Sequence, residues 1–188
     1  MAFVFALFSE MLVNHVKVRL DKIAICFVAG IILPYLLSAI VRILDAYTGR
    51  EVIIIPMILA FLPDSGAYFV GIRFGKRKLA PVVSPNKTVE GAIGGAATAI
   101  IGMLIYALVM DLATSRDVSY GLALLYGVLG AVAGVFGDLM FSAIKRQTGI
   151  KDYSNLLPGH GGILDRFDSM MTVAPLAEVL IILLPMVV

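Results

Sequence analysis

The sequence predicts an all-α polytopic membrane protein with about five transmembrane helices, a short apolar N-terminal helix and site loops that face the cytoplasm. Composition is the first reason: 60% of the 188 residues are hydrophobic, only 15% are charged, and the mean hydropathy is +0.98. Soluble domains contain about 45–50% apolar and about 25% charged residues. The other reasons are long apolar runs and an alternation of basic residues between the loops. The same composition excludes a disordered chain, which would be poor in apolar residues.

Each expected span is an apolar run of the length, about 18 residues or more, that a helix needs to cross a bilayer. The runs cover residues 23–41, 52–72, 88–110, 118–141 and 169–188. Residues 1–13 are apolar but too short to span, and we interpret them as an interfacial helix or as the remnant of a longer one. We treat residues 1–188 as a single integral membrane domain, with 1–22 as the remnant of a longer N-terminal region.

Small residues recur at four-residue spacing in two of the expected spans. The pairs Gly91/Gly95 and Gly130/Gly134 have the spacing that lets helix backbones approach closely in a membrane. We therefore expect these faces to pack helix against helix.

Basic residues alternate between the loops. The loops at 14–22, 73–87 and 142–168 hold twelve of the fifteen Lys and Arg residues, whereas those at 42–51 and 111–117 hold three. The positive-inside rule places the first set in the cytoplasm and the carboxyl terminus outside. We expect a multi-pass protein of the cytoplasmic membrane whose active site faces the cytoplasm. The net charge of +2 is too small for a nucleic-acid partner.

Four acidic residues interrupt apolar stretches: Glu10, Asp64, Asp138 and Glu178. A carboxylate in hydrocarbon is costly and has to face a polar interior. Asp64 and Asp138 lie near the basic ends of their spans, so we expect them to approach one cytoplasm-facing pocket. Glu178 is expected to pair or to reach the membrane surface.

The loop at 142–168 is dense in groups that bind phosphate and metal. Its cations can neutralise anionic oxygens; they are Lys145, Arg146, Lys151 and Arg166. Gly161 and Gly162 beside His160 let the backbone approach a phosphate. Hard oxygen ligands for Mg²⁺ are Asp138, Asp165 and Asp168. A basic loop that holds anionic lipid headgroups is the simpler interpretation, but it explains neither the carboxylates nor the glycines.

The loop at 73–87 repeats the theme before the third span, with Ser84, Asn86, Lys87 and Thr88. Pro85 disfavours helix at Ser84, so we expect the helix to open near residues 86–88, with free amide groups that can bind phosphate. The alternative is ordinary capping, for which Ser or Thr together with Glu near a helix start is equally typical.

Together these residues resemble the phosphatidate cytidylyltransferase (CDP-diacylglycerol synthase) family. The motifs S-x-x-K-R, K-D, P-x-H-G-G and D-R-x-D of that family all occur between Ser142 and Asp168. Supporting motifs are P-D-S-G-A-Y from Pro63, G-K-R from Gly75, S-P-N-K-T-V-E-G from Ser84 and G-D at Gly137. The similarity covers residues 61–171, the expected catalytic signature region. Family members commonly carry Lys at position 86 and an aromatic residue at position 89, and have further helices before the span at 23–41.

The resemblance implies transfer of CMP from CTP to phosphatidic acid, giving CDP-diacylglycerol and pyrophosphate in phospholipid biosynthesis. The implied cofactor is Mg²⁺ or another divalent cation, held by Asp138 and Asp165, with Asp168 and Asp64 next in rank. The implied catalytic set is Asp138, Asp165, Lys145, Arg146, Lys151, His160 and Arg166. The implied substrate-binding set is Ser84, Asn86, Lys87, Thr88, Gly161 and Gly162. His160 either donates a hydrogen bond to phosphate or shapes the glycine turn.

Two alternatives stay open at this point. One is a related CTP-dependent enzyme that acts on another lipid phosphate or a lipid alcohol. The other, of a different class, is an ion or proton transporter that uses Asp64 and Asp138 as a relay. A transporter needs carboxylates at several depths, whereas here the charges collect at one face. The expected partners are CTP, phosphatidic acid and the bilayer; a homo-oligomer is left open.

Overall fold

The computed structural model describes residues 1–46, 50–114, 116–154 and 161–187. The chain divides into two compact units, Met1–Ser38 and Ala39–Val188. Each unit is described by itself. That the whole chain forms a single membrane domain stays a prediction.

The first unit consists of helices. α1 (Ala2–Val13) is followed by α2 (Leu20–Phe27), the π-helical turn η1 (Val28–Ile32) and α3 (Leu33–Leu37). The π turn ends two residues before Pro34, which has no N–H to donate and whose ring displaces the carbonyl one turn earlier. The Phe3 ring packs on Gly30, so α1 folds back on the helix that follows. The apolar run at 1–13 is therefore helical, while its place at the interface stays a prediction.

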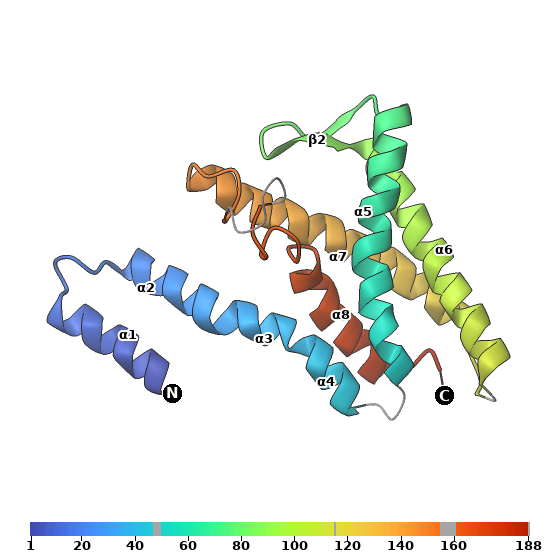
Figure 1. The fold of residues 1–188 in the computed structure, drawn as a ribbon, viewed down its shortest axis with the longest axis horizontal. Coiled ribbons are helices and arrows are strands. Elements are labelled where there is room, and N and C mark those ends of the chain that lie inside the picture. Colours follow the sequence, from blue (N-terminus) through green and yellow to red (C-terminus); the bar gives the residue numbers. More distant parts are fainter. Residues whose placement is uncertain (47–49, 115, 155–160, 188) are drawn as a thin grey trace. The chain divides into compact units, whose positions relative to one another are not determined.

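The second unit is a helical bundle with one β-hairpin (Figure 1). It begins with α4 (Ala39–Ala46), the 3₁₀ turn η2 (Arg50–Ile53) and α5 (Ile54–Phe74). The antiparallel strands β1 (Lys78–Ala80) and β2 (Ser84–Thr88) form the hairpin, and the bundle ends with α6 (Val89–Ala113), α7 (Tyr120–Gln147) and α8 (Met170–Leu183).

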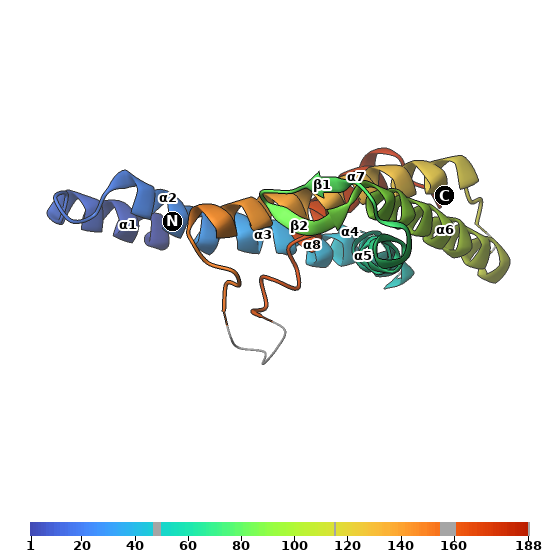
Figure 2. The ribbon, with the colours of Figure 1, turned by 90° about the horizontal axis from the view of Figure 1, so that it is seen from above.

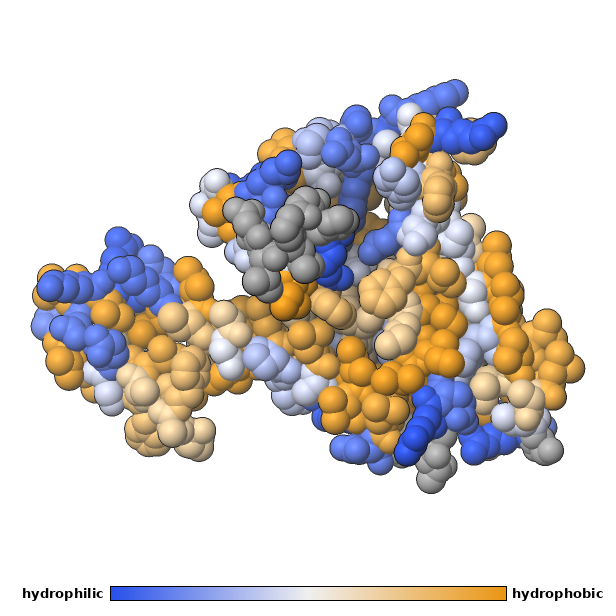
Figure 3. Space-filling view, in the orientation of Figure 1, coloured by the Kyte–Doolittle hydropathy of each residue, from blue (hydrophilic) through white to orange (hydrophobic). Residues whose placement is uncertain are grey.

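Helix lengths and hydropathy confirm an all-α polytopic membrane protein. Within the described residues, four helical stretches are long and apolar enough to cross a membrane: Leu20–Asp45, Arg50–Phe74, Val89–Ala113 and Tyr120–Gln147. They match the first four expected spans. Figure 3 shows hydrophilic residues gathered at both ends of the second unit, with hydrophobic residues between them.

Three expected boundaries were wrong. The fifth span, expected over 169–188, is the 14-residue helix α8, because Pro185 disfavours helix before it and Val187 instead bridges to Val118. α6 begins at Val89, since residues 84–88 pair as β2. α7 continues to Gln147, six residues past the expected end, so Lys145 and Arg146 lie on a helix rather than in a loop.

Glycines set the closeness of the helix packing. A Cβ at Gly91 would lie 2.8 Å from the Ala67 carbonyl oxygen, and one at Gly95 would lie 2.6 Å from that of Pro63. α6 therefore packs with its backbone directly against the carbonyls of α5. Gly130 of α7 packs on Leu59 of α5 with similar closeness. The packing role expected for the two glycine pairs is confirmed most clearly at Gly91 and Gly95.

Contacts at the two ends of the second unit confirm the expected pairing of loops. At one end, Arg116 forms a 3.4 Å ion pair with Glu51 and joins the segments that flank α6 and α5. At the other end, Arg146 Nε donates a 3.3 Å hydrogen bond to the Val83 carbonyl and joins α7 to the hairpin. The basic loops at 73–87 and 142–168 therefore share one end of the bundle.

Replacing Gly95 by Ala is expected to destabilise the bundle by about 1–3 kcal/mol, because the new methyl group meets the Pro63 carbonyl oxygen and the two backbones have to separate. The temperature at which half of the detergent-solubilised protein remains monodisperse measures this. Gly121→Ala is the matched control, since nothing lies within 4 Å of its added Cβ. Equal melting of the two variants would show that close packing at Gly95 is unimportant.

Candidate active site

A cavity of about 550 Å³ opens between α5, the hairpin, α6 and α7. Its polar lining comes from four elements and comprises Asp64, Lys78, Asn86, Lys87, Thr88 and Asp138. Its apolar lining includes Tyr68, Ile72, Leu79 and Val135. The volume lies in the range of about 300–1,000 Å³ that is usual for small-molecule sites.

Helix periodicity places several of the residues that line the cavity on one face of α5. Asp64, Tyr68, Gly71 and Gly75 follow one another at three- and four-residue steps, so they share one face of α5. The glycines Gly71, Gly75 and Gly91 also line the cavity, and an added Cβ at each would meet a neighbouring atom within 3.2 Å, so they let the chain pack closely beside it. The sequence predicted that Asp64 and Asp138 approach one pocket, and the structure confirms it.

An ion pair joins Lys87 of the hairpin to Asp138 of α7 within this cavity. About a quarter of each side chain is exposed, at 25% and 23%. The Ser142 hydroxyl, one helical turn further along α7, donates a 3.2 Å hydrogen bond to Asp138 Oδ1. Lys87 therefore lies opposite Asp138 in the site, while its substrate-binding role stays a prediction; Ser142 was not among the predicted site residues.

Three carboxylates are close enough to repel one another: Asp64, Asp138 and Asp168. The Ser169 hydroxyl donates a 3.4 Å hydrogen bond to Asp64 Oδ2 and ties the start of α8 to α5. Asp168 lies just before α8. Burial, together with the negative charge of Asp138, raises the pKa of Asp168 to about 6. This grouping of negative charge at one place favours the binding of a cation.

Asp165 plays a different part, because both of its oxygens already accept hydrogen bonds. Lys145 Nζ donates to Oδ1 at 2.8 Å, and the backbone N–H groups of Tyr153 and Gly162 each donate to Oδ2 at 2.9 Å. Burial opposes the charge on this carboxylate, but the hydrogen bonds outweigh it and lower the pKa of Asp165 below its usual value. Gly161 adopts a φ of +76°, which lets the chain turn around the carboxylate.

Lys145 completes this network from α7. Its side chain is 11% exposed and that of Asp165 is 5% exposed, so the pair is largely removed from solvent. The Lys145 ammonium also lies 5.4 Å from the centre of the Tyr153 ring, and the Tyr153 hydroxyl donates a 3.2 Å hydrogen bond to the Phe141 carbonyl. The pair thus holds the segment after α7 against the helix. A direct metal or phosphate contact by Asp165 or Lys145 stays a prediction.

The remaining predicted residues are dispersed. Lys151 and Arg166 are exposed in the segment between α7 and α8, and Arg146 turns toward the hairpin. Ser84 pairs with Ala80 in the hairpin and does not line the cavity. His160 lies outside the described residues. Among the intramembrane acids, Glu178 forms two 2.6 Å hydrogen bonds with Arg42, as its expected pairing required.

The expectation of open amide groups at the start of α6 was wrong. The Thr88 hydroxyl caps the helix by accepting a 3.1 Å hydrogen bond from Gly91 N–H, and Val89 N–H donates to the Arg77 carbonyl. Glu90 Oε2 accepts hydrogen bonds of 3.0 and 3.1 Å from the N–H groups of Lys76 and Arg77. The helix start is therefore used to fix the root of the hairpin.

Sequence reasoning missed Glu90, Ser142, Tyr153 and Ser169 as organisers of the site. Ser142 could have been found, because it lies four residues after Asp138 on the same helical face. The contacts of Glu90 and Tyr153 join residues 12 to 14 positions apart through loop geometry, for which the sequence carries no periodic signal.

The carboxylates of the cavity fit a divalent cation that also takes ligands from a substrate. Among the described residues, no group of three or more His, Cys, Asp or Glu side chains is arranged to hold a metal ion. Mg²⁺, however, is commonly held by one or two carboxylates together with substrate phosphates. Asp138 with Asp64 or Asp168 has the oxygen atoms for such a set, and that these residues hold Mg²⁺ stays a prediction.

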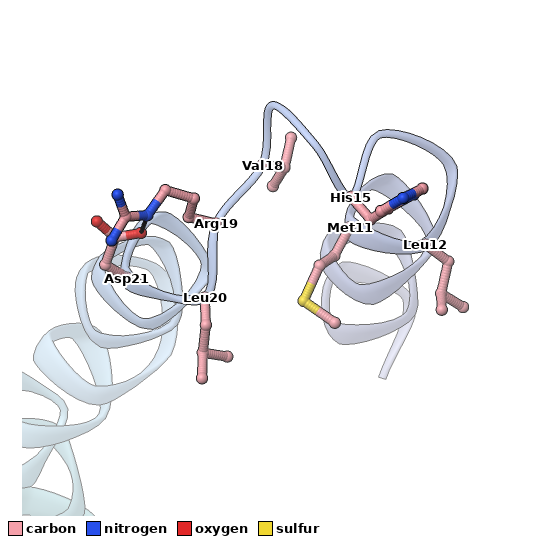
Figure 4. Close-up of a pocket in the computed structure, with 7 residues that line it drawn as sticks. All are labelled: Met11, Leu12, His15, Val18, Arg19, Leu20 and Asp21. Atoms are coloured by element: carbon pink, nitrogen blue, oxygen red, sulfur yellow. Dashed lines mark ion pairs between the residues drawn. The ribbon is translucent and has the colours of Figure 1, made fainter.

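A second cavity, of about 590 Å³, belongs to the first unit and lies between α1 and α2 (Figure 4). Figure 4 shows Met11, Leu12 and Leu20 beside it, with the ion pair between Arg19 and Asp21 on its rim. That ion pair is 3.6 Å long and well exposed. This cavity does not bring together the phosphate- and metal-binding groups that gather around Asp138.

Comparison with known proteins decides the family. The model of the cytidylyltransferase family matches residues 1–184. The chain belongs to this family. It is 47% identical over 135 residues to the phosphatidate cytidylyltransferase of Bacillus subtilis (strain 168), a match that covers 72% of the chain and 48% of the relative.

Staphylococcal relatives of the same name give similar values. The identity is 46% over 134 residues with the phosphatidate cytidylyltransferase of Staphylococcus saprophyticus, and 43% over 134 residues with that of Staphylococcus aureus (strain COL). Each match covers 71% of the chain and 50% of the relative. The chain therefore spans about half the length of the curated relatives it matches.

Replacing Asp165 by Asn leaves the buried Lys145 ammonium without its counter-charge, at a cost of about 3 kcal/mol. We expect the segment between α7 and α8 to detach more often, so that trypsin cuts the vesicle-reconstituted protein faster after Lys151 and Arg166. Asp117→Asn, at an exposed position between α6 and α7, is the control and should be cut after Lys151 and Arg166 at the wild-type rate. Equal cleavage of Asp165→Asn and wild type would contradict the assigned role.

Replacing Glu90 by Ala removes the acceptor for two backbone N–H groups at the root of the hairpin. Amide hydrogen exchange at Lys76 and Arg77 should accelerate by about tenfold, because both N–H groups lose their acceptor. Glu90→Gln keeps a side-chain carbonyl acceptor and should restore most of the protection. Unchanged exchange in Glu90→Ala would show that the hairpin is held by other contacts.

Proposed function

We propose that this protein transfers CMP from CTP to phosphatidic acid, giving CDP-diacylglycerol and pyrophosphate. The observation that carries the proposal is the cavity in which Lys87 faces Asp138, next to Asp64, at the basic end of a helical membrane bundle. Family membership supports it, as do relatives named phosphatidate cytidylyltransferase that are 43–47% identical.

The place of the cavity suits one water-soluble and one lipid substrate. CTP is a soluble anion, whereas phosphatidic acid stays in the leaflet. The cavity combines polar groups from the hairpin with apolar groups from α5, including Tyr68 and Ile72, which are 64% and 70% exposed. The basic loops share this end of the second unit, and the positive-inside rule favours the cytoplasmic face of the cell membrane for it.

The reaction needs little proton transfer. An anionic phosphate oxygen of phosphatidic acid attacks the α-phosphorus of CTP, a new P–O bond forms, and the bond to pyrophosphate breaks. Because the nucleophile is already ionised, the protein has to neutralise charge and align the two reactants. We assign this work to Lys87, with Asn86 and Lys78 beside it in the cavity lining.

The basic groups after α7 complete the anion-binding set in this proposal. Arg146, Lys151, Arg166 and the glycines Gly161 and Gly162 lie on or near the segment that Asp165 anchors. His160 belongs to the same stretch of sequence, with its role still open between phosphate binding and shaping the turn. We assign a divalent cation, Mg²⁺ by its preference for oxygen ligands, to Asp138 with Asp64 or Asp168; when bound, it would neutralise charge on the phosphate oxygens.

The transporter alternative finds less support. The described carboxylates that face one another lie together at one end of the bundle, and Glu178 is engaged by Arg42. Nothing in the structure favours a different lipid phosphate or a lipid alcohol over phosphatidic acid. Comparing the reaction rates with phosphatidic acid, another lipid phosphate and a lipid alcohol tests this choice of substrate.

The test supplies radiolabelled CTP, Mg²⁺ and phosphatidic acid to vesicles that contain the protein. We expect CDP-lipid to form, and Lys87→Ala and Asp138→Asn each to lower its rate by about 100-fold or more, because each removes one charge from the reacting centre. Chelation of divalent cations should abolish the product.

Asp117→Asn is the matched control, since this exposed carboxylate lies between α6 and α7, at the end of the second unit away from the cavity. It should keep the wild-type rate. The proposal fails if the wild-type protein forms no CDP-lipid, or if Asp138→Asn forms as much as Asp117→Asn.

A further inference from the structure

The hairpin between α5 and α6 has a tip of unusual composition. The tip is formed by Pro81, Val82 and Val83, which connect β1 to β2. Turns exposed to water are usually built from Gly, Asn, Asp or Ser, which tolerate the turn backbone and bond to water. Here Val82 is 87% exposed, and Pro81 beside it is exposed as well. An apolar tip is therefore displayed where a soluble loop would be polar.

The charge around this tip has one sign. Residues 73–87 contain the basic side chains Arg73, Lys76, Arg77, Lys78 and Lys87 and no acidic residue. Lys76, Arg77 and Lys78 are exposed on the strand side that leads to the tip. An apolar tip flanked by basic side chains is complementary to an anionic lipid surface, where the apolar groups enter the interface and the cations meet the headgroups.

The tip is also held near the ends of membrane helices. Its two roots are α5 and α6, both long and apolar enough to cross a bilayer. The five residues of β2 extend about 17 Å at most, at about 3.3 Å per residue. The hairpin runs across the end of α5 instead of continuing along its axis, as two perpendicular views show (Figures 1 and 2). The tip therefore stays close to the level at which α5 and α6 end.

Two contacts keep the hairpin in this orientation. Glu90 accepts hydrogen bonds from the Lys76 and Arg77 N–H groups at the root, and Arg146 donates to the Val83 carbonyl next to the tip. Neither contact covers the Val82 side chain. The body of the hairpin thus lines the cavity while the apolar side chain at its tip points away from the packed protein.

We propose that the tip of this hairpin, Pro81 and Val82, inserts into the headgroup region of the bilayer that holds the helices, and that Lys76 and Arg77 bind anionic phospholipid there. This contact is a membrane-docking surface separate from the cavity. It does not rest on the proposed enzymatic activity, because it requires neither nucleotide nor turnover. By docking, the hairpin would carry Lys87 at a fixed height relative to the lipid headgroups.

The absence of tryptophan from the sequence makes a direct test available. Val82→Trp places the chain's single indole at the tip. The variant is reconstituted into phosphatidylcholine vesicles with or without phosphatidylglycerol, an anionic lipid that is not the proposed substrate. We expect the emission to shift to shorter wavelength, brominated lipid to quench it and aqueous iodide to quench it weakly. Pro81→Trp is a second tip variant, used in case the substitution at Val82 perturbs the turn, and its indole should respond in the same way.

Two matched variants separate the proposed contact from its alternatives. Asp117→Trp, at the opposite end of the second unit, should be quenched by iodide and show no dependence on anionic lipid. Adding Lys76→Gln and Arg77→Gln to Val82→Trp should weaken the dependence on phosphatidylglycerol by about fivefold for each cation removed.

Strong iodide quenching of the tip indole in both kinds of vesicle would overturn the proposal, since the tip would then face water. Protection from both iodide and brominated lipid would also overturn it, because the tip would then be covered by protein, such as a second copy of the chain. A third set of vesicles carries phosphatidic acid in place of phosphatidylglycerol. If the tip indole responds to phosphatidic acid but not to phosphatidylglycerol, the effect comes from substrate in the cavity, and a docking surface is likewise rejected.

Discussion

The ion pair between Lys87 and Asp138 is the interaction on which the site depends. A carboxylate on an apolar helix has to be paired or to face a polar space, because hydrocarbon cannot solvate it. Asp138 meets this requirement with a cation that comes from the hairpin, 51 positions earlier in the chain by residue number. For that cation to arrive, α5 and α6 have to pack closely and the hairpin between them has to be fixed. The glycine contacts of α6 allow the close packing, and the hydrogen bonds of Glu90 fix the hairpin.

A second ion pair, between Lys145 and Asp165, organises the other half of the site. It lies largely out of solvent and is surrounded by hydrogen bonds from Tyr153 and Gly162. Its effect is to hold the segment after α7 beside the carboxylates of the cavity. Asp168, whose pKa is raised to about 6, follows Asp165 by three residues and interacts electrostatically with Asp138. One pair thus lies in the cavity, and the other fixes the segment that carries Asp168.

Prediction from the sequence succeeded where the physical signal is local or periodic. Apolar runs located the four long helices, and the spacing of Gly91 and Gly95 indicated their close packing. Asp64 and Asp138 were assigned to one pocket because a carboxylate in an apolar run has few places to lie. Prediction failed for the end of the fifth span, where α8 is short and Val187 bridges to Val118, and for residues 84–88, which form β2. In both places strands pair over only a few residues, which leaves no periodic pattern in the sequence.

The sequence by itself determined that this is a helical membrane protein with a basic end, and it determined the inventory of carboxylates, cations and glycines at that end. Hydropathy and charge are additive properties of single residues, so they can be read along the chain. Only the tertiary structure decided which carboxylate meets which cation: Asp138 with Lys87 in the cavity, and Asp165 with Lys145 between α7 and the segment that follows it. The reason is that an ion pair depends on the distance between atoms of different elements, and that distance is set by packing.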